Sequence, residues 1–204
     1  MKVKICGIRT LAAAKAAEAV GADFIGFVFA PGRRHIEPEE AAVICRSVRH
    51  SGKVGVFVDE AWQEVNRIAA LCGLDFVQLH GSESEAYAKQ ISVPVIKAFR
   101  WGDDFSSAAA NHYPARYILL DSFSRGMAGG TGKSFDWQSA AAAVREIEKP
   151  VFIAGGIGAA NVHEVRQVLQ PFGVDASGSL EIKGNKSAAL MKEFVLAVRE
   201  ADKS

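Results

Sequence analysis

The sequence predicts a single α/β domain, residues 1–204, folded as a closed (β/α)8 barrel. Short apolar runs recur along the chain, and each is followed by an amphipathic, alanine-rich stretch. Successive runs are about 24 residues apart, which is the length of one strand-plus-helix unit. The runs begin near Val3, Phe24, Val54, Phe76, Val95, Tyr117, Val151 and Val174. Eight units of nearly equal length, without a proline- or glycine-rich linker, favour one ring of strands.

The apolar runs have the composition of parallel strands that are covered on both faces. Residues 24–29, 54–58 and 117–120 are rich in β-branched and aromatic side chains. They are continuously apolar rather than alternating, which is typical of strands in a parallel sheet with helices on its outer face.

The stretches between the strands carry the start and stop signals of helices. Thr10 and Gly21 flank an alanine-rich segment over residues 11–20. Asp59 is predicted to cap a helix over residues 62–72, which Gly73 ends. The last helix has a stripe of apolar residues that indicates packing rather than partner recognition: Leu190, Phe194, Val195 and Val198.

A doubly wound open sheet is the alternative architecture for alternating strands and helices. Its dinucleotide-binding form has a Gly-x-Gly-x-x-Gly turn after the first strand. No such turn follows the strand that begins near Val3, so the sequence favours the barrel.

Composition excludes several classes of function. The 24 Lys and Arg nearly balance the 23 Asp and Glu, with a formal net charge of +1, which argues against a basic nucleic-acid-binding face. No apolar run approaches the roughly 20 residues of a membrane helix, and residues 1–5 are too polar for a signal-peptide core. The three cysteines, Cys6, Cys45 and Cys72, cannot all pair with one another. We therefore expect a cytoplasmic protein that binds neither nucleic acid nor membranes.

Glycine and serine follow the last two predicted strands. In a (β/α)8 barrel the active site lies at the carboxyl ends of the strands, and this region often binds phosphate. Gly155 and Gly156 follow the seventh run, and Ser177 and Gly178 follow the eighth. Glycine lets the backbone approach an anion, and serine adds a hydroxyl donor. Glycines that merely let the loops turn are the alternative, but their occurrence after two adjacent strands favours a phosphate site.

A glycine-rich loop follows the sixth run, with glycines at 126, 129, 130 and 132. We expect this loop to be a lid over the substrate, with Gly130 contacting phosphate. Gly132-Lys133-Ser134 resembles the end of a nucleotide-binding P-loop. That motif requires glycine where Met127 stands and a strand leading directly into it, so the sequence argues against nucleoside triphosphate binding.

Cys6 and Asp121 are the candidate base and acid. Cys6 stands at the end of the first strand, near predicted phosphate-binding N–H groups that would favour a thiolate. Asp121 follows four apolar residues, and partial burial favours the protonated carboxyl of a general acid. A buried structural cysteine and an ordinary strand-end aspartate are the alternatives. Cys45 and Cys72 lie in predicted helices and are assigned to packing.

Four further strand-end residues are candidate substrate contacts: Arg34, Gln78, His80 and Asp175. An arginine fork binds a carboxylate with two hydrogen bonds, although the residues alone do not rank Arg34 above Arg9 or Arg33. No group of His, Cys, Asp and Glu has the spacing of metal ligands.

Seven short motifs lie in order within a stretch that runs from residue 3 to about residue 181. They are Lys4-Ile5-Cys6-Gly7-Ile8, Gly26-Phe27-Val28-Phe29 with Arg34 following, Val54-Gly55-Val56-Phe57-Val58, Val77-Gln78-Leu79-His80-Gly81, Leu119-Leu120-Asp121-Ser122, Gly132-Lys133-Ser134-Phe135-Asp136-Trp137 and Ala154-Gly155-Gly156-Ile157. Each motif alone is weak, but together the motifs resemble the phosphoribosylanthranilate isomerase family over nearly the whole chain.

The resemblance implies a TIM barrel of tryptophan biosynthesis that uses no cofactor. It implies an Amadori rearrangement of N-(5-phosphoribosyl)anthranilate to 1-(2-carboxyphenylamino)-1-deoxyribulose 5-phosphate. By the same resemblance, Cys6 is the general base, Asp121 is the general acid and Arg34 binds the anthranilate carboxylate. The expected partner is a phosphorylated small molecule, and the chain is expected to be a monomer or a homodimer.

One segment departs from the family pattern. After the last strand the family usually reads Asp-Val-Ser-Ser-Gly-Val-Glu, whereas this chain reads Asp-Ala-Ser-Gly-Ser-Leu-Glu over residues 175–181. Asp175, Ser177 and Glu181 align, while the second serine and the glycine exchange places. The exchange moves one hydroxyl, and the residue able to take a positive φ, by one position at the predicted phosphate site.

Three alternative functions remain open from the sequence. Another sugar-phosphate barrel, such as the aminoaldose isomerase of histidine biosynthesis, tends to use paired aspartates, and Cys6 argues against it. A barrel that binds a phosphate ligand without catalysis is suggested only by the exchange at residues 178 and 179. A structural subunit docked on a tryptophan-pathway partner would form a tight complex and show no turnover.

Overall fold

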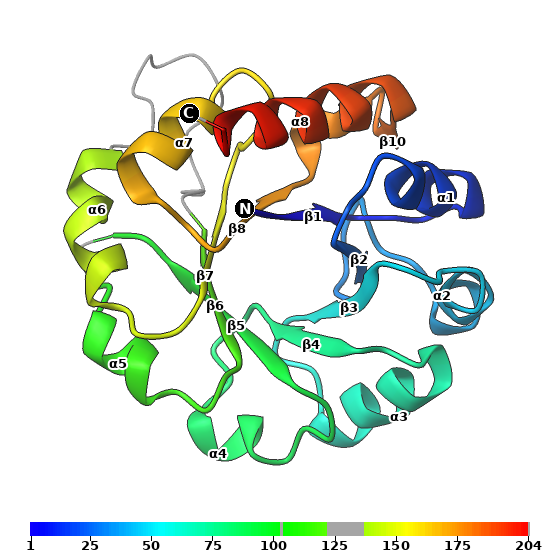
Figure 1. The fold of residues 1–204 in the computed structure, drawn as a ribbon. Helices are drawn as coiled ribbons and strands as arrows, with labels where there is room; N and C mark the ends of the chain where they lie inside the picture. The colour runs from blue at the N-terminus through cyan, green and yellow to red at the C-terminus, as the bar shows by residue number, and fades with distance from the viewer. Residues whose placement is uncertain (103, 122–136, 204) are drawn as a thin grey trace.

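The computed structural model describes residues 1–102, 104–121 and 137–203 of the chain. Eight parallel strands close into a barrel inside a ring of helices, so the predicted fold class is confirmed (Figure 1). Each strand pairs with its successor, and β1 also pairs with β8. The strands are β1 Lys2–Cys6, β2 Phe24–Val28, β3 Gly52–Phe57, β4 Phe76–Leu79, β5 Val95–Arg100, β6 Tyr117–Asp121, β7 Val151–Ala154 and β8 Gly173–Ala176.

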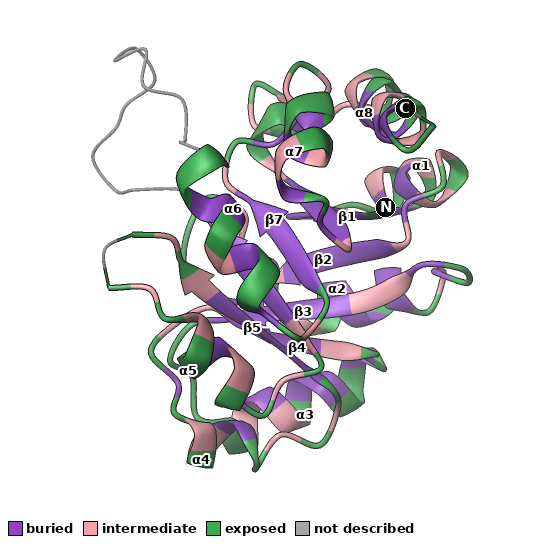
Figure 2. Ribbon diagram, turned by 60° about the vertical axis from the view of Figure 1, so that its left-hand side comes forward, coloured by how far each residue is buried: buried purple, intermediate pink, exposed green. Residues whose placement is uncertain are grey.

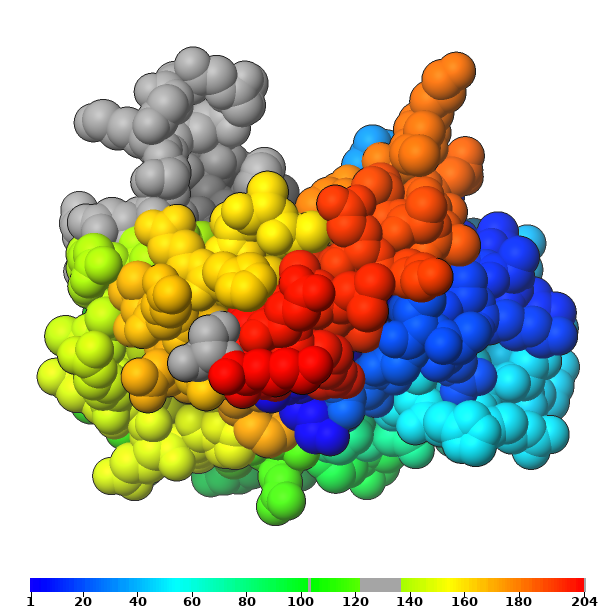
Figure 3. All heavy atoms as spheres, turned by 45° about the horizontal axis from the view of Figure 1, so that its top comes forward, coloured from blue at the N-terminus to red at the C-terminus, as the bar shows by residue number. Residues whose placement is uncertain are grey.

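A helix follows each barrel strand along the chain, and none of the described helices is long and apolar enough to cross a membrane. The helices are α1 Leu11–Ala19, α2 Pro38–Cys45, α3 Trp62–Cys72, α4 Glu85–Ala88, α5 Ser107–His112, α6 Trp137–Glu146, α7 Val162–Leu169 and α8 Ala188–Ala201. Between β8 and α8 lie a 3-10 turn, η1 Gly178–Leu180, and an antiparallel hairpin of β9 Glu181–Ile182 and β10 Asn185–Lys186. The hairpin projects from the surface beside α8 (Figure 3).

Three of the four predicted helix signals are found in the structure, among them Gly21, which follows the C-cap residue of α1 with φ 88°. The side chain of Thr10 accepts a hydrogen bond from the backbone N–H of Ala13 at 3.2 Å, and Gly73 ends α3 in the left-handed conformation at φ 59°. The prediction that Asp59 caps α3 is wrong, because the N-cap is Ala61 and makes no side-chain hydrogen bond. Asp59 instead accepts a hydrogen bond from the backbone N–H of Ser82 at 2.6 Å, which joins the loops after β3 and β4.

The barrel has two apolar layers, one between strands and helices and one inside the ring. Figure 2 shows the strands almost wholly buried and the outer faces of the helices exposed. Aromatic rings fill the ring's interior at the amino-terminal ends of the strands. Phe152 makes edge-to-face contacts with Phe24 at 5.5 Å, Tyr117 at 5.7 Å and Phe172 at 5.4 Å between ring centroids.

Strand alternation places polar groups above this aromatic plug. Successive side chains of a strand point to opposite faces, so residues two apart share the interior. On β6 the interior positions are Tyr117, Leu119 and Asp121, from the plug to the carboxyl end. On β1 the same rule places Lys4 and Cys6 inside the ring. The plug therefore closes one end of the barrel, and the functional groups gather at the other.

The last helix returns the chain to its first strand. The guanidinium of Arg199, in α8, donates a hydrogen bond to the carbonyl of Met1 at 2.8 Å. The amino group of Met1 forms an ion pair with Asp202. Residues 1 and 202 are therefore held side by side.

Truncating the plug should destabilise the whole barrel. Because Phe152 is fully buried, Phe152→Ala is expected to lower the free energy of unfolding by about 3–5 kcal/mol. Phe152→Leu should lose less, and Leu196→Ala, which alters a half-exposed residue of α8, should change it by less than about 0.5 kcal/mol. Urea denaturation measures all three, and a loss below about 1 kcal/mol in Phe152→Ala would contradict this role.

Candidate active site

A cavity of about 500 Å³ opens at the carboxyl ends of the strands. Every predicted site residue that the structure describes lines it: Cys6, Arg34, Gln78, His80, Asp121, Gly155, Gly156, Asp175, Ser177 and Gly178. Gly130 and the predicted lid at residues 122–134 lie outside the described residues. Val28, Val56, Val58 and Ile157 add an apolar wall. The cavity therefore combines an apolar side with several polar groups, as a small-molecule site does.

Cys6 ends β1 and is buried against two neighbouring strands. Its carbonyl accepts a hydrogen bond from the Ser177 hydroxyl at 2.9 Å. Gly26 of β2 leaves the room that the thiol occupies, since a Cβ added there would lie 2.8 Å from Cys6 Sγ and 3.3 Å from Lys4 Nζ. Burial raises the pKa of the Cys6 thiol, and the charge and hydrogen bond of the Lys4 ammonium only partly offset that effect.

Lys4 forms an ion pair inside the barrel that the sequence analysis did not identify. Its Nζ lies 3.0 Å from Oδ2 of Asp175, and the two residues are register partners in the β1–β8 pair. Burial lowers the pKa of Lys4, but the charges of Asp175 and Cys6 outweigh burial, and the net shift is upward. Burial also raises the pKa of Asp175 in spite of Lys4. In this pair the charged form of Lys4 is therefore favoured, whereas burial opposes the ionised form of Asp175.

Two buried acceptor atoms at the cavity lack hydrogen-bond partners among the described residues. They are Oδ1 of Asp175 and Oε1 of Gln78. Buried polar atoms in native proteins nearly always have a partner, and an exception marks a place where water or a ligand donates. Both side chains line the cavity, so a ligand with hydroxyl or N–H donors would satisfy them.

Asp121, His80 and Gln78 form a chain of contacts across the cavity. His80 Nε2 lies 3.3 Å from Asp121 Oδ2, and His80 Nδ1 lies 2.8 Å from the amide nitrogen of Gln78. The amide donates to Nδ1, which assigns the ring proton of a neutral His80 to Nε2, facing Asp121. His80 therefore orients the carboxyl of Asp121.

A buried salt bridge supports the loop that carries His80. Lys97 Nζ, on β5, lies 2.7 Å from Oε2 of Glu83 and donates to the carbonyl of Gly81 at 2.7 Å. Glu83 in turn accepts a hydrogen bond from the backbone N–H of Gly81 at 3.0 Å. These contacts fix the backbone next to His80. Neither Glu83 nor Lys97 was among the predicted residues.

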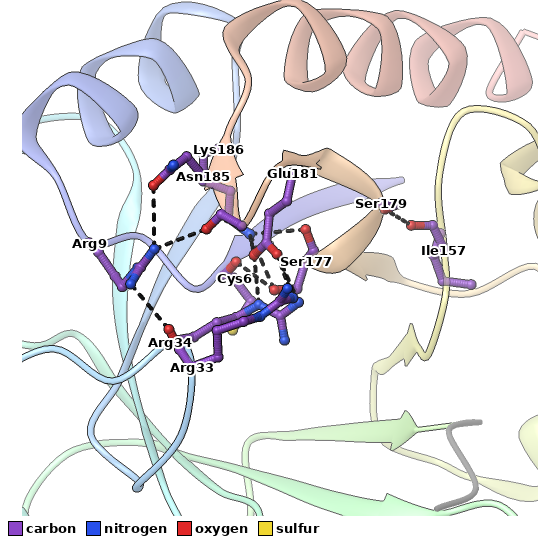
Figure 4. A network of polar contacts seen from close by, with 11 residues as sticks. Cys6, Arg9, Arg33, Arg34, Ile157, Ser177, Ser179, Glu181, Asn185 and Lys186 are labelled. Carbon is purple, nitrogen blue, oxygen red and sulfur yellow. Dashed lines mark hydrogen bonds and ion pairs between the residues drawn. The ribbon is translucent and has the colours of Figure 1, made fainter. Parts of the chain in front are cut away.

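Glu181, on β9, binds three cations at the rim (Figure 4). Arg34 forms a two-pronged contact with it, Nε to Oε1 at 2.7 Å and Nη2 to Oε2 at 3.1 Å. Arg33 contacts Oε2 at 2.8 Å, and the buried Lys186 contacts Oε1 at 2.9 Å. Burial raises the pKa of Glu181, but the hydrogen bonds from Arg34 and Lys186 outweigh it and hold the pKa at about 2. Glu181 is thus an anion that fixes the Arg34 fork.

The three arginines that the sequence did not rank differ in position. Arg33 and Arg34 line the cavity. Arg9 lies outside it and donates to the carbonyls of Arg33 at 3.1 Å and Gly184 at 2.9 Å. Arg34 is the less exposed of the two cavity arginines, with 31 % of its side chain exposed against 64 % for Arg33.

The predicted phosphate end is formed by β7, β8 and η1. Gly155 and Gly156 have φ of 90° and 72°, a conformation that favours glycine. Gly178 has no positive φ, and its missing side chain instead makes room for Arg34, whose Nη2 would lie 3.1 Å from an added Cβ. The displaced hydroxyl of Ser179 donates to the carbonyl of Ile157 and joins the two loops. With glycine at 178 and serine at 179, Arg34 can pack against residue 178, and the Ser179 hydroxyl holds the loop after β7.

Comparison with known proteins gives one consistent result. Residues 3–197 match the family model of N-(5'-phosphoribosyl)anthranilate (PRA) isomerase. The N-(5'-phosphoribosyl)anthranilate isomerase of Desulforudis audaxviator is 44 % identical over 98 % of this chain and 98 % of its own. Phosphoribosyl anthranilate isomerase from Thermotoga maritima has a TM-score of 0.89 at 34 % identity, covering 98 % of this chain and 99 % of its own. A phosphoribosyl anthranilate isomerase in complex with reduced 1-(O-carboxyphenylamino)-1-deoxyribulose 5-phosphate has a TM-score of 0.85 at 32 % identity, with the same coverage.

Neutralising Glu181 should destabilise the protein in a pH-dependent way. Glu181→Gln is expected to lower the free energy of unfolding at pH 7 by about 1–3 kcal/mol, since it weakens charged hydrogen bonds. The pKa of Glu181 is about 2 in the folded chain, below its unfolded value of about 4.3, so its contribution is complete above about pH 5. That contribution is lost as the pH falls towards 2, and the difference between variant and wild type should shrink.

Urea denaturation at pH 7, 5 and 3.5 measures this difference. Glu64→Gln is the control, because its pair with Arg67 on α3 is exposed to solvent and should contribute no measurable stability at any of these pH values. A difference for Glu181→Gln that stays constant from pH 7 to pH 3.5 would contradict the assignment.

Proposed function

The chain belongs to the N-(5'-phosphoribosyl)anthranilate isomerase family, and on that premise we propose how its own residues carry out the reaction. It is an isomerase of tryptophan biosynthesis that converts N-(5-phosphoribosyl)anthranilate into 1-(2-carboxyphenylamino)-1-deoxyribulose 5-phosphate. In our proposal residues 1–204 form one catalytic domain, Cys6 is the general base and Asp121 is the general acid. The observation that carries this assignment is that a thiol from β1 and a carboxyl from β6 face one cavity.

Asp121 acts first, as the acid that opens the ribose ring. Its carboxyl proton passes to the ring oxygen, the bond from that oxygen to C1' breaks, and the nitrogen lone pair forms a protonated Schiff base. The contact of His80 Nε2 with Asp121 Oδ2, at 3.3 Å, holds Asp121 in place for this transfer. A positioned proton transfer of this kind is typically worth about 10²–10⁴-fold in rate.

Cys6 acts second, as the base that removes the proton from C2'. The electrons of that C–H bond form the C1'–C2' double bond, and those of the C=N bond return to nitrogen, giving an enolamine. Tautomerisation then places a proton on C1' and leaves the ketone at C2'. Burial opposes the thiolate needed for this step, and the positive charge of the Lys4 ammonium favours it.

Four side chains position the substrate in this proposal. Arg34, fixed by Glu181, binds the anthranilate carboxylate, and the apolar wall receives the aromatic ring. The unpartnered acceptors of Gln78 and Asp175 take hydrogen bonds from ribose hydroxyls. His80 lies between Gln78 and Asp121 and contacts the same part of the sugar.

The phosphate is proposed to lie against the loops after β7 and β8. Gly155 and Gly156 have positive φ values, a backbone conformation that residues with a side chain rarely adopt. The Ser177 hydroxyl and the Gly178 N–H belong to the neighbouring loop, after β8. Backbone N–H groups and hydroxyls of this kind bind phosphate at this end of a barrel. Gly130 is proposed as a further contact from the loop after β6.

The cellular setting remains part of the proposal. We propose that the enzyme acts in the cytoplasm, as a monomer or a homodimer, on a phosphorylated small molecule and not on nucleic acid. The near balance of Lys and Arg with Asp and Glu supports the last point.

Removing the acid should abolish turnover and preserve binding. Asp121→Asn keeps the shape of the side chain but cannot supply the carboxyl proton, so kcat should fall by about 10²–10⁴-fold. The KM should change much less, because Arg34 and the phosphate loops are untouched. The assay generates phosphoribosylanthranilate in situ and follows the loss of its fluorescence. Asp75→Asn, at the amino-terminal face of the barrel, should retain full activity, and wild-type kcat in Asp121→Asn would exclude the assignment.

Removing the base should have an equally large effect. Cys6→Ala is expected to lose at least about 10²-fold in kcat, since alanine cannot take the C2' proton. Cys45→Ala is the matched control, because Cys45 is buried in α2 and does not line the cavity. The same fluorescence assay applies. Turnover by Cys6→Ala at the wild-type rate would remove Cys6 from this role, and saturable binding without turnover in the wild type would point to a binding-only barrel.

A further inference from the structure

Two side chains that line the cavity, Cys6 and Asp175, share a third ionisable neighbour, Lys4. Lys4 is fully buried, and Cys6 and Asp175 are each 8 % exposed. The Lys4 ammonium lies 3.0 Å from Asp175 Oδ2. Lys4 Nζ and Cys6 Sγ both lie beside Gly26, and the Lys4 charge acts on the thiol as well as on the carboxyl. The room for this arrangement comes from Gly26, at which a Cβ would collide with the thiol and crowd the ammonium. The reaction steps given above use Cys6 and one oxygen of Asp175, and give Lys4 no role beyond favouring the thiolate.

Burial limits the charge that these three groups can carry. With both acids ionised the cluster has a net charge of −1, and with both protonated it has +1. Either state is unfavourable where water is excluded, whereas one ionised acid beside one ammonium is neutral. The pKa values of Cys6 and Asp175 are both raised, in each case chiefly by burial, and the charge of Asp175 raises the pKa of Cys6 further.

Charged groups of neighbouring elements also act on the cluster. Lys186 of β10 and Arg34 of the β2–α2 loop face Cys6 from the rim. Asp121 of β6 and His80 of the β4 loop face Asp175 across the cavity. Glu181 neutralises part of the charge of Arg34 and Lys186, so these outer groups influence Cys6 less directly than the buried ammonium does.

We propose that Lys4 is a positioning residue for the general base, whose ammonium binds both Cys6 and Asp175, and that these two acids hold one proton between them. Cys6 becomes a thiolate when its S–H bond breaks and the proton forms an O–H bond on Asp175, while Lys4 stays positively charged. Asp175 is thus the store for the thiol proton as well as a substrate contact. The inference rests on the proposed role of Cys6 as the base.

The test measures thiol acidity without substrate. The rate at which iodoacetamide alkylates Cys6 is followed from pH 6 to pH 10, with mass spectrometry of the Cys6 peptide to separate it from Cys45 and Cys72. The midpoint of the profile reports the thiol pKa, whereas the limiting rate also depends on access. Lys53→Met, which removes a lysine outside the cavity, is the control and should leave the midpoint unchanged.

The two single variants should shift the midpoint in opposite directions. Lys4→Met removes the counter-charge and should raise it by at least one pH unit, a tenfold slower alkylation at a pH below both midpoints. Asp175→Asn removes the competing acid and leaves the ammonium to the thiol alone, so the midpoint should fall by at least one unit. The double variant Lys4→Met/Asp175→Asn has neither buried charge, and its midpoint should be raised as in Lys4→Met. It therefore tests the same effect if Lys4→Met alone does not fold.

Opposite shifts support the shared proton, and a purely structural role for Lys4 would move neither midpoint. Unchanged midpoints, or shifts in the same direction for Asp175→Asn and the double variant, overturn the proposal. Failure of the proposed function itself is seen separately, as full turnover in Cys6→Ala.

Discussion

The pairing of β1 with β8 is the interaction on which the rest of the structure depends. It joins segments 171 residues apart in the chain and sets Lys4 opposite Asp175. The same closure brings the Ser177 hydroxyl onto the carbonyl of Cys6 and the β9–β10 hairpin over the rim. An open sheet of the same strands would leave Lys4 and Asp175 at opposite edges, each exposed to water. Ring closure therefore brings these ionisable groups together and buries them in a region of low dielectric constant.

Most of the barrel and the outline of its site could be predicted from the sequence, because both follow from simple rules of spacing. Continuous apolar runs about 24 residues apart identify the strands of a (β/α)8 barrel. The rule that function lies at the carboxyl ends of the strands then selects Cys6 and Asp121, each the last residue of its strand. The predicted residues within the described ranges all line one cavity, although their roles remain proposals.

The roles that the sequence did not reveal depend on contacts between distant segments. Lys4 resembles any lysine of an amino-terminal strand until β8 is placed beside it. Glu181 and Lys186 lie on strands of two residues, which are too short to show a periodic pattern. Asp59 has the residue type and position of a helix cap, but its carboxylate instead accepts a hydrogen bond from the backbone N–H of Ser82, in another loop. In each case tertiary contacts decide what local sequence leaves open.

The hydrogen bond and the ion pair of Met1 with α8 and Asp202 hold residues 1 and 202 next to each other at the closed side of the ring. A linker of a few residues would join these two positions, and the ring could then be opened in another loop, such as residues 89–94 between α4 and β5, without changing the order of strands around it. The order of the strands along the chain therefore constrains the fold less than their order around the ring does. Circular permutation would reassign the first strand while Lys4 and Asp175 remained neighbours.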